Sequence, residues 1–349
     1  MATQPRAKTE QLLKRSWSIE LTDHVISTAW IASGDKIAAA VVSGPIVIAD
    51  AVTGRILHTL HGHGFGTTAV GWQPGTDVLA STGQDGKAKL WNTTTGECSR
   101  ELVGGAAWVE LLAWHPAGKL FATAAGKSVR VWTADGDMVR EFKEHPASVL
   151  DLAWKPGTSL LGAATYGGIF VYDPTLDEPV RKYDWKGSPL VLVWSPDGRL
   201  LAHGNQDSTV HFWFADADTP LQMHGFPTKV RELSFDSTSR YLATGGGAAA
   251  CVWDCGGPGP EGRKPQMLMD EVGESEASLT ACRWQHRGFR IAGTFADGAV
   301  RVWQPAAKGK LIGEDTFADG EAVHPSWSPD DRRLLVGSGG GTLAMFKVG

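Results

Sequence analysis

One aromatic position recurs along the chain at intervals of 40 to 49 residues. It is filled by Trp30, Trp72, Trp114, Trp154, Trp194, Phe235, Trp284 and Trp327. A second position follows 18 or 19 residues after each of these, at Ala49, Trp91, Trp132, Tyr172, Trp213, Trp253, Trp303 and Phe346. The two series use 12 of the 15 tryptophans. A fixed period of this length indicates a repeat architecture, in which each unit packs mainly on its neighbours.

Each repeating unit has the pattern of short strands joined by tight turns. In the second unit, residues 70–91, an apolar segment ends in Trp, and a polar turn, a small-residue segment and a second turn lead to an alternating segment that again ends in Trp. Period-2 segments separated by Pro, Gly and Asp are typical of strands and hairpins. A fourth candidate strand follows seven of the units, at residues 55–60, 97–102, 138–142, 179–183, 219–224, 266–269 and 310–313.

The period and the closing Trp are similar to those of the WD40 repeat family, whose repeats form four-stranded propeller blades. The resemblance covers residues 17–349, because all eight units agree in both aromatic series. The closing Trp-Asp dipeptide of the family appears only at Trp253-Asp254, and its Gly-His dipeptide is clear only at Gly62-His63. The resemblance implies an all-β propeller in which most tryptophans belong to the scaffold.

The two ends of the sequence predict how the ring closes. The last unit ends at residue 349 and leaves no residues for its own outer strand, whereas residues 15–21 have strand character and no unit of their own. We therefore expect this N-terminal strand to complete the last blade, which would cover its exposed edge. The result is eight four-stranded blades, or seven if the first and weakest unit is not a full blade. Residues 15–349 are expected to form one domain and residues 1–14 a flexible lead-in.

The composition argues against several classes of partner. The formal net charge is −5 and no block of Lys and Arg stands out, so a nucleic-acid surface is not expected. The first twenty residues lack the apolar core of a secretory signal, and no apolar run approaches the roughly 18 residues of a membrane helix. Four widely spaced cysteines do not form a disulfide framework. These features predict a cytoplasmic protein without a membrane partner.

The WD40 resemblance also implies a buried polar network in the second blade. Blades of this family often carry a hydrogen-bonded set of His, Ser or Thr, Asp and Trp, and the matching residues here are His63, Ser81, Asp85 and Trp91. A buried Asp needs hydrogen-bond donors, which a His and a hydroxyl supply. Other units place an Asp at the corresponding position without the His, so we expect one full tetrad.

The sequence offers few candidates for catalysis or metal binding. His58, His61 and His63 are close in sequence, and imidazoles suit zinc, copper or nickel. However, His58 falls on an outer strand and His63 on the tetrad, so structural roles are favoured over a metal site. No phosphate-binding glycine loop and no Gly-x-Ser-x-Gly motif occur. We expect no catalytic residues, no cofactor and no enzymatic activity.

The loops that lead into the first strands should converge at the mouth of the central channel. The position six residues before each first-strand aromatic is occupied by His24, Gly66, Trp108, Ser148, Ser188, Lys229, Ser278 and Glu321, and Phe65, Arg231, Glu232 and Arg283 are expected to extend the same rim. Trp108 lies outside both aromatic series, and a Trp beside Arg and Lys is typical of an interface anchor. The alternative is that Trp108 folds over the channel and packs on its neighbours.

These observations predict a non-catalytic scaffold that binds a protein or peptide through the face carrying these loops, here called the top face. One alternative is a metal-handling or enzymatic propeller that uses the central channel or the cluster of His58, His61 and His63. Another is a purely structural role as a subunit of a larger complex. The fold alone does not name the partner, because propellers support many unrelated functions.

Overall fold

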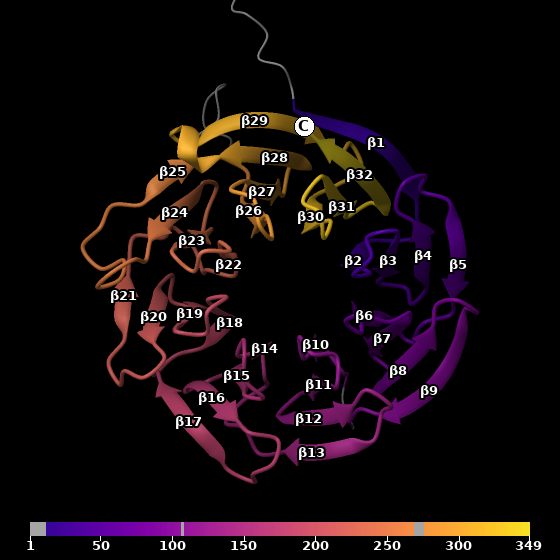
Figure 1. Cartoon of the computed structure of the whole chain (residues 1–349), viewed down its shortest axis with the longest axis horizontal. Coiled ribbons are helices and arrows are strands. Elements are labelled where there is room, and N and C mark those ends of the chain that lie inside the picture. The colour runs from indigo at the N-terminus through magenta and orange to yellow at the C-terminus, as the bar shows by residue number, and fades with distance from the viewer. Residues whose placement is uncertain (1–11, 106–107, 269–275) are drawn as a thin grey trace, which may run out of the picture.

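The computed structural model describes residues 12–105, 108–268 and 276–349. In these residues the chain forms 32 strands and one short 3₁₀ helix, η1 (Pro305–Ala307). The strands make eight four-stranded antiparallel sheets that surround a central axis as the blades of a propeller (Figure 1). The prediction of eight blades is confirmed, and the seven-bladed alternative is wrong. Within the described residues, no helix combines the length and hydropathy needed to cross a membrane.

The two inner strands of each blade are the ones nearest the central axis. The innermost strands of blades 1 to 8 are β2 (Val25–Trp30), β6 (Thr67–Trp72), β10 (Leu111–Trp114), β14 (Asp151–Trp154), β18 (Pro189–Trp194), β22 (Leu233–Phe235), β26 (Leu279–Trp284) and β30 (Ala322–Trp327). The second strands are β3 (Lys36–Val41), β7 (Val78–Gly83), β11 (Leu120–Ala125), β15 (Leu161–Thr165), β19 (Leu200–Asn205), β23 (Tyr241–Thr244), β27 (Ile291–Phe295) and β31 (Arg333–Ser338). Both aromatic series therefore mark strand ends.

The two outer strands complete each blade. The third strands are β4 (Ile46–Asp50), β8 (Lys87–Asn92), β12 (Ser128–Thr133), β16 (Gly168–Tyr172), β20 (Val210–Phe214), β24 (Ala250–Asp254), β28 (Ala299–Gln304) and β32 (Thr342–Val348). The outermost are β5 (Ile56–Leu60), β9 (Glu97–Val103), β13 (Met138–Phe142), β17 (Pro179–Asp184), β21 (Leu221–Met223), β25 (Gln266–Leu268), β29 (Lys310–Thr316) and β1 (Leu13–Glu20). The predicted outer strands match within a few residues; residue 269 of one of them lies outside the described residues.

The ring closes in blade 8, whose strand order is β1-β32-β31-β30. Strand β1 pairs antiparallel with β32 from Leu13 opposite Val348 to Glu20 opposite Thr342. The prediction that the N-terminal strand completes the last blade is confirmed. The strand begins at Leu13 and not at Arg15, because the Leu13 side chain is buried in the core between blades 7 and 8. Of the expected lead-in, residues 1–11 lie outside the described residues.

Hydrophobic packing joins each blade to the next. The buried apolar side chains form eight clusters, and each cluster contains residues of two adjacent blades. In the seam between blades 2 and 3, for example, Phe121 and Trp132 of blade 3 share a cluster with Leu90 of blade 2. Leu79 and Trp91, also of blade 2, belong to the seam with blade 1. The core is thus a ring of seams, and each blade is stabilised from both sides.

Hydrogen bonds from the first aromatic series reinforce four of the seams. The indole Nε1 of Trp30 donates to the carbonyl oxygen of Ser326 at 3.0 Å, across the junction of blades 8 and 1. Equivalent bonds run from Trp114 to Gly71, from Trp154 to Ala113 and from Trp327 to Arg283, at 2.9, 3.0 and 3.0 Å. Each of these bonds links the innermost strands of two consecutive blades.

Three other seams use a side-chain oxygen in place of the indole. The Leu192 backbone N–H donates to the Asp151 carboxylate at 2.9 Å. The backbone N–H of Val70 donates to Ser27 Oγ at 3.2 Å, and the backbone N–H of Trp284 donates to Ser234 Oγ at 3.1 Å. In the same three seams the buried indole nitrogens, of Trp72, Trp194 and Trp284, have no hydrogen-bond partner. A polar residue on the preceding inner strand therefore replaces the cross-blade indole bond.

Two buried histidines lie opposite each other in blade 5. His203 on β19 and His211 on β20 stack with ring centroids 5.2 Å apart. His203 contacts Asn205 through Nδ1 at 2.9 Å and accepts from the Trp213 indole at 3.2 Å, whereas neither ring nitrogen of His211 has a hydrogen-bond partner. Burial lowers the pKa of His203 to about 3 and that of His211 to about 4. Both imidazoles are therefore neutral in the folded protein.

This pair predicts loss of stability in mild acid. Unfolded imidazoles take up protons near pH 6.5, whereas the folded ones do so only near pH 3 and 4. Above pH 6.5 the histidines are neutral in both states, and the free energy of unfolding does not depend on their protonation. As the pH falls from 6.5 toward 4, the free energy of unfolding decreases by about 1.4 kcal/mol per pH unit for each histidine. The substitution His211→Phe should raise the free energy of unfolding at pH 5 by about 1–2 kcal/mol, because it removes two buried unpaired nitrogens.

Urea unfolding at pH 7.5 and pH 5 measures both effects. The exposed His61, in the loop after β5, provides the control substitution His61→Phe, and this variant should keep the wild-type pH dependence. A His211→Phe protein that loses stability between the two pH values as steeply as the wild type would contradict the prediction.

Candidate functional site

The predicted tetrad residues meet in blade 2 and form a continuous hydrogen-bond chain. The Trp91 indole donates to Ser81 Oγ at 2.8 Å, Ser81 contacts His63 Nε2 at 2.8 Å, and His63 Nδ1 contacts Asp85 Oδ1 at 2.8 Å. Burial of the imidazole lowers the pKa of His63, although Asp85 acts in the opposite direction. A neutral His63 with its proton on Nδ1 satisfies every member of the chain.

Parts of this network recur in other blades, where the sequence analysis did not place them. The closing Trp donates to a middle-strand hydroxyl in blades 3 and 6, from Trp132 to Thr123 at 2.9 Å and from Trp253 to Thr244 at 3.1 Å. In blade 4 the Tyr172 hydroxyl contacts His145 at 2.9 Å. His145 lies nine residues before its first-strand aromatic, as His63 does, so the repeat alignment contained the signal.

The tetrad predicts a large effect for its central hydroxyl. Ser81→Ala would leave the His63 and Trp91 nitrogens unpaired in the core, which should lower the free energy of unfolding by about 2–3 kcal/mol. Chemical denaturation measures this loss. The control Ser99→Ala changes a half-exposed hydroxyl on β9 of the same blade and should cost less than about 1 kcal/mol. Equal losses for both variants would show that the tetrad adds nothing to stability.

The histidine cluster does not converge on one point of the structure. His63 is buried in the tetrad, His58 lies half-buried on β5, and His61 is exposed in the loop between them. Among the residues that the structure describes, no group of three or more His, Cys, Asp and Glu side chains is arranged to hold a metal ion. The geometry thus assigns His63 to the scaffold.

The top face carries most of the predicted rim residues. Phe65 and Trp108 keep 78% and 55% of their surface exposed, and Lys229 and Arg231 are also exposed in the loop before β22. Three further rim residues, His24, Glu232 and Glu321, are half-buried. Burial raises the pKa of Glu232, although the backbone N–H groups of Arg231 and Gly246 donate to its carboxylate at 3.2 Å.

The placement of Arg283 on the rim was wrong. Arg283 lies one residue before the end of β26, at the opposite end of that strand from the connecting loop. It lies five residues beyond the rim position Ser278, which corresponds to roughly 16 Å along an extended strand. Arg283 therefore belongs to the wall around the axis, where its guanidinium donates to the carbonyl oxygen of Cys282 at 2.8 Å.

Two exposed apolar side chains that the sequence analysis did not identify extend the surface around Phe65 and Trp108. Leu150 precedes β14 and is 40% exposed, and Tyr166 in the turn between β15 and β16 is 53% exposed. Phe65, Trp108, Leu150 and Tyr166, here called the apolar arc, come from the top loops of blades 2, 3 and 4. These three blades follow one another around the ring (Figure 1). Large apolar side chains gathered on a surface commonly mark an interaction site.

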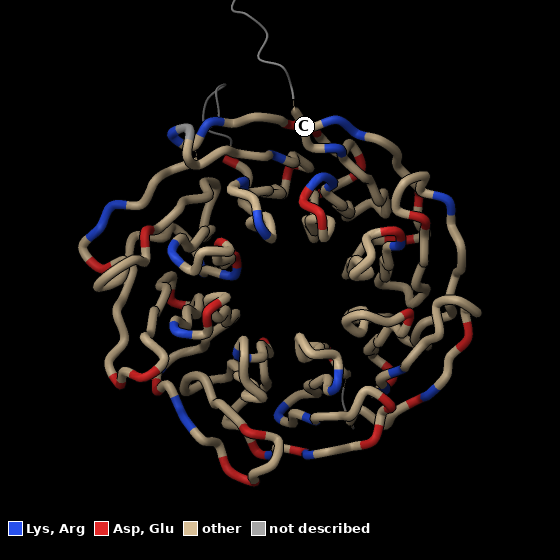
Figure 2. Tube along the Cα trace, in the orientation of Figure 1, with Lys and Arg blue, Asp and Glu red and all other residues tan. Residues whose placement is uncertain are grey.

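Charged residues gather in the loops and turns beside the inner strands of other blades. Near the axis, the tube of blades 6 to 8 carries Lys, Arg, Asp and Glu, whereas that of blades 2 and 3 is mostly uncharged (Figure 2). Asp151 at the start of β14 and His324 in β30 each lie three residues before the aromatic of their innermost strand. Burial raises the pKa of Asp151 to about 6, and desolvation within the ring, with Arg283 nearby, lowers that of His324 to about 4.

Comparison with known proteins agrees with the architecture. The family described as WD domain, G-beta repeat matches residues 54–92, 96–133, 179–213 and 219–254. Each matched segment begins at the outermost strand of one blade and ends with the third strand of the next. The sequence repeat is therefore offset from the structural blade by one strand, which is why the first strand of the chain completes the last blade.

Two curated relatives share part of this chain. WD repeat-containing protein 91 of Danio rerio is 33% identical over 98 residues, which cover 27% of this chain and 13% of that protein. The same-named protein of Mus musculus is 27% identical over 175 residues, which cover 43% of this chain and 23% of that protein. The matched regions thus span less than a quarter of the length of these relatives.

A solved structure shows the same ring. The computationally designed Ika8 protein superposes with a TM-score of 0.80 over 94% of this chain and 98% of its own, at 19% sequence identity. This likeness establishes the class as an eight-bladed propeller. The four segments that match the WD domain, G-beta repeat family identify the chain as a WD40 repeat β-propeller. WD40 propellers commonly act as interaction scaffolds and are typically non-catalytic.

Proposed function

We propose that this propeller is a non-catalytic, cytoplasmic scaffold that binds a protein or peptide partner through its top face. The observation that carries the proposal is the apolar arc, in which four large apolar side chains remain exposed on the top loops of three consecutive blades. The other exposed large apolar side chains of the described residues lie on outermost strands or on loops of the opposite face. The arc is therefore localised and not a general property of the surface.

The chemistry of the top face suits a partner with an apolar anchor and a charged flank. Trp and Tyr combine a large contact area with a polar atom and are common at the centre of interfaces. Lys229 and Arg231 of blade 6 project from the same face and would pair with acidic groups. Because exposed charges act mainly on association rate and specificity, we assign the affinity to the apolar arc and the orientation to blade 6.

Affinity purification from the native organism, followed by mass spectrometry, identifies the partner, and a titration with the purified partner measures binding. Trp108→Ala should weaken binding at least tenfold, since a buried interface Trp commonly contributes more than about 2 kcal/mol. Arg231→Glu should weaken it less and mainly slow the association.

Two control variants separate loss of contact from loss of fold. Met138→Ala removes an exposed apolar side chain from the outermost strand of blade 3, and Lys182→Glu reverses an exposed charge on β17. Both should bind as the wild type does. If Trp108→Ala and Arg231→Glu, with wild-type melting temperatures, retain every partner at full affinity, the top face is not the binding surface.

A further inference from the structure

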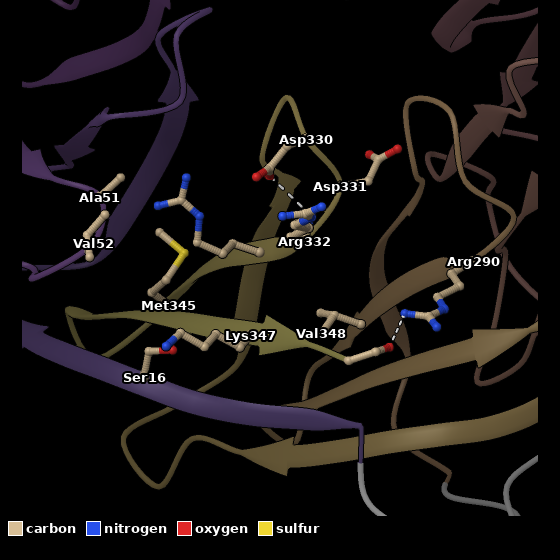
Figure 3. A pocket seen from close by; sticks show the side chains of 12 residues that line it. Ser16, Ala51, Val52, Arg290, Asp330, Asp331, Arg332, Met345, Lys347 and Val348 are labelled. Atoms are coloured by element: carbon tan, nitrogen blue, oxygen red, sulfur yellow. Dashed lines mark hydrogen bonds between the residues drawn. The ribbon is translucent and has the colours of Figure 1, made fainter.

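A cavity of about 680 Å³ lies at the junction of blades 8 and 1, on the face opposite the apolar arc. Its lining comes from the turn between β30 and β31, from β1 and β32, and from the loop after β4 (Figure 3). Val52, Met345 and Val348 supply apolar surface, and Arg332 and Lys347 supply positive charge. The guanidinium groups of Arg290 and Arg333 donate to the backbone oxygens of Gly349 and Gly34. The volume falls within the range typical of small-ligand sites, roughly 300–1,000 Å³.

Three of the basic residues in this region form a row across blade 8. Lys347 on β32 lies directly opposite Arg333 on β31 and directly opposite Lys14 on β1. Residues that face each other across antiparallel strands project from the same side of the sheet, and like charges at such positions repel each other. The register therefore gathers three basic residues at neighbouring positions on one side of blade 8, a row that attracts a negative charge.

Lys347 is also an exception to the repeat. It occupies the position after the closing aromatic, which the other blades fill with Asp50, Asn92, Thr133, Asp173, Phe214, Asp254 and Gln304. In blade 1, Asp50 lies opposite Lys36, and in blade 6, Asp254 forms an ion pair with Arg240 at 2.8 Å. Blade 8, like blade 1, has a basic residue opposite this position, Arg333, but it has a lysine in place of the aspartate.

The two aspartates of the lining, Asp330 and Asp331, accept hydrogen bonds from backbone and hydroxyl groups. Asp331 accepts from the backbone N–H groups of His286, Arg287 and Gly288 at 2.7, 2.7 and 3.0 Å. Asp330 accepts from Ser328 Oγ at 2.5 Å and from the backbone N–H of Arg332 at 3.2 Å. Within the described part of the chain, neither Arg332 nor Lys347 forms an ion pair with a carboxylate.

We propose that this cavity binds a small organic anion in which a carboxylate or phosphate group is joined to an apolar body. The anionic group would lie between Lys347 and Arg332, where it would offset the repulsion along the basic row. The apolar body would lie against Val52 and Val348. This site is independent of the top face, because it lies on the other side of the propeller and uses different blades.

Titration of the full chain with octanoate, octyl phosphate, inorganic phosphate and 1-octanol tests the proposal by calorimetry. At least one of the two amphiphilic anions should bind saturably with a dissociation constant below about 1 mM, more tightly than octanol or inorganic phosphate. The preference between octanoate and octyl phosphate identifies the anionic group.

Two variants locate the site. Lys347→Asp restores the residue type found at Asp50 and Asp254, so it should weaken anion binding at least tenfold while raising the melting temperature through a new pair with Arg333. Arg332→Glu, at an exposed turn position without a side-chain partner, should also weaken binding. Lys119→Glu, at the equivalent turn position of blade 3, should bind as the wild type does.

Three results would overturn the proposal. The first is no saturable binding of either amphiphilic anion to the wild type. The second is binding no tighter than that of 1-octanol, which would remove the role of the basic residues. The third is undiminished binding in both Lys347→Asp and Arg332→Glu, which would place the ligand elsewhere on the surface.

Discussion

The antiparallel pairing of β1 with β32 is the contact on which the rest of the ring depends. A blade with three strands would expose the edge of β32, and the seams on both sides of blade 8 would lose part of their core. The pairing is extensive, from Leu13 opposite Val348 to Glu20 opposite Thr342, and it carries Leu13 into the cluster shared with blade 7. Closure therefore links residues that are more than 300 positions apart. In the closed ring each blade packs on a neighbour at both sides.

Once the ring is closed, the seams hold the blades with little help from the loops. Each seam buries its own apolar cluster, and seven of the eight add a hydrogen bond between neighbouring inner strands, either from an indole or to a side-chain oxygen. Because the scaffold is fixed by these internal contacts, the connecting loops can vary in sequence without loss of the fold. This separation explains how a family with one architecture supports many binding functions.

The candidate sites lie where the chain departs from its own repeat. Trp108 and Tyr166 are aromatic residues that no seam requires, and both remain exposed on the top face. Lys347 is basic, whereas no other blade has a basic residue at this position. A residue that costs stability, or adds none, and still occupies a regular position is best explained by an interaction outside the chain. The repeats therefore act as an internal reference against which functional residues stand out.

The sequence by itself determined the fold class, eight blades in preference to seven, and the donated strand, because these rest on a spacing that is repeated along the chain. The tetrad residues followed from the resemblance to the WD40 family. The structure alone decided what depends on neighbours in space. Only the structure shows that Arg283 lies in the wall around the axis and that Leu150 and Tyr166 are exposed on the same face as Trp108. It also shows that Lys347 lies between two other basic residues, on the neighbouring strands. Spacing along a chain predicts strands and turns, but exposure and cross-strand partners arise only when distant segments pack together.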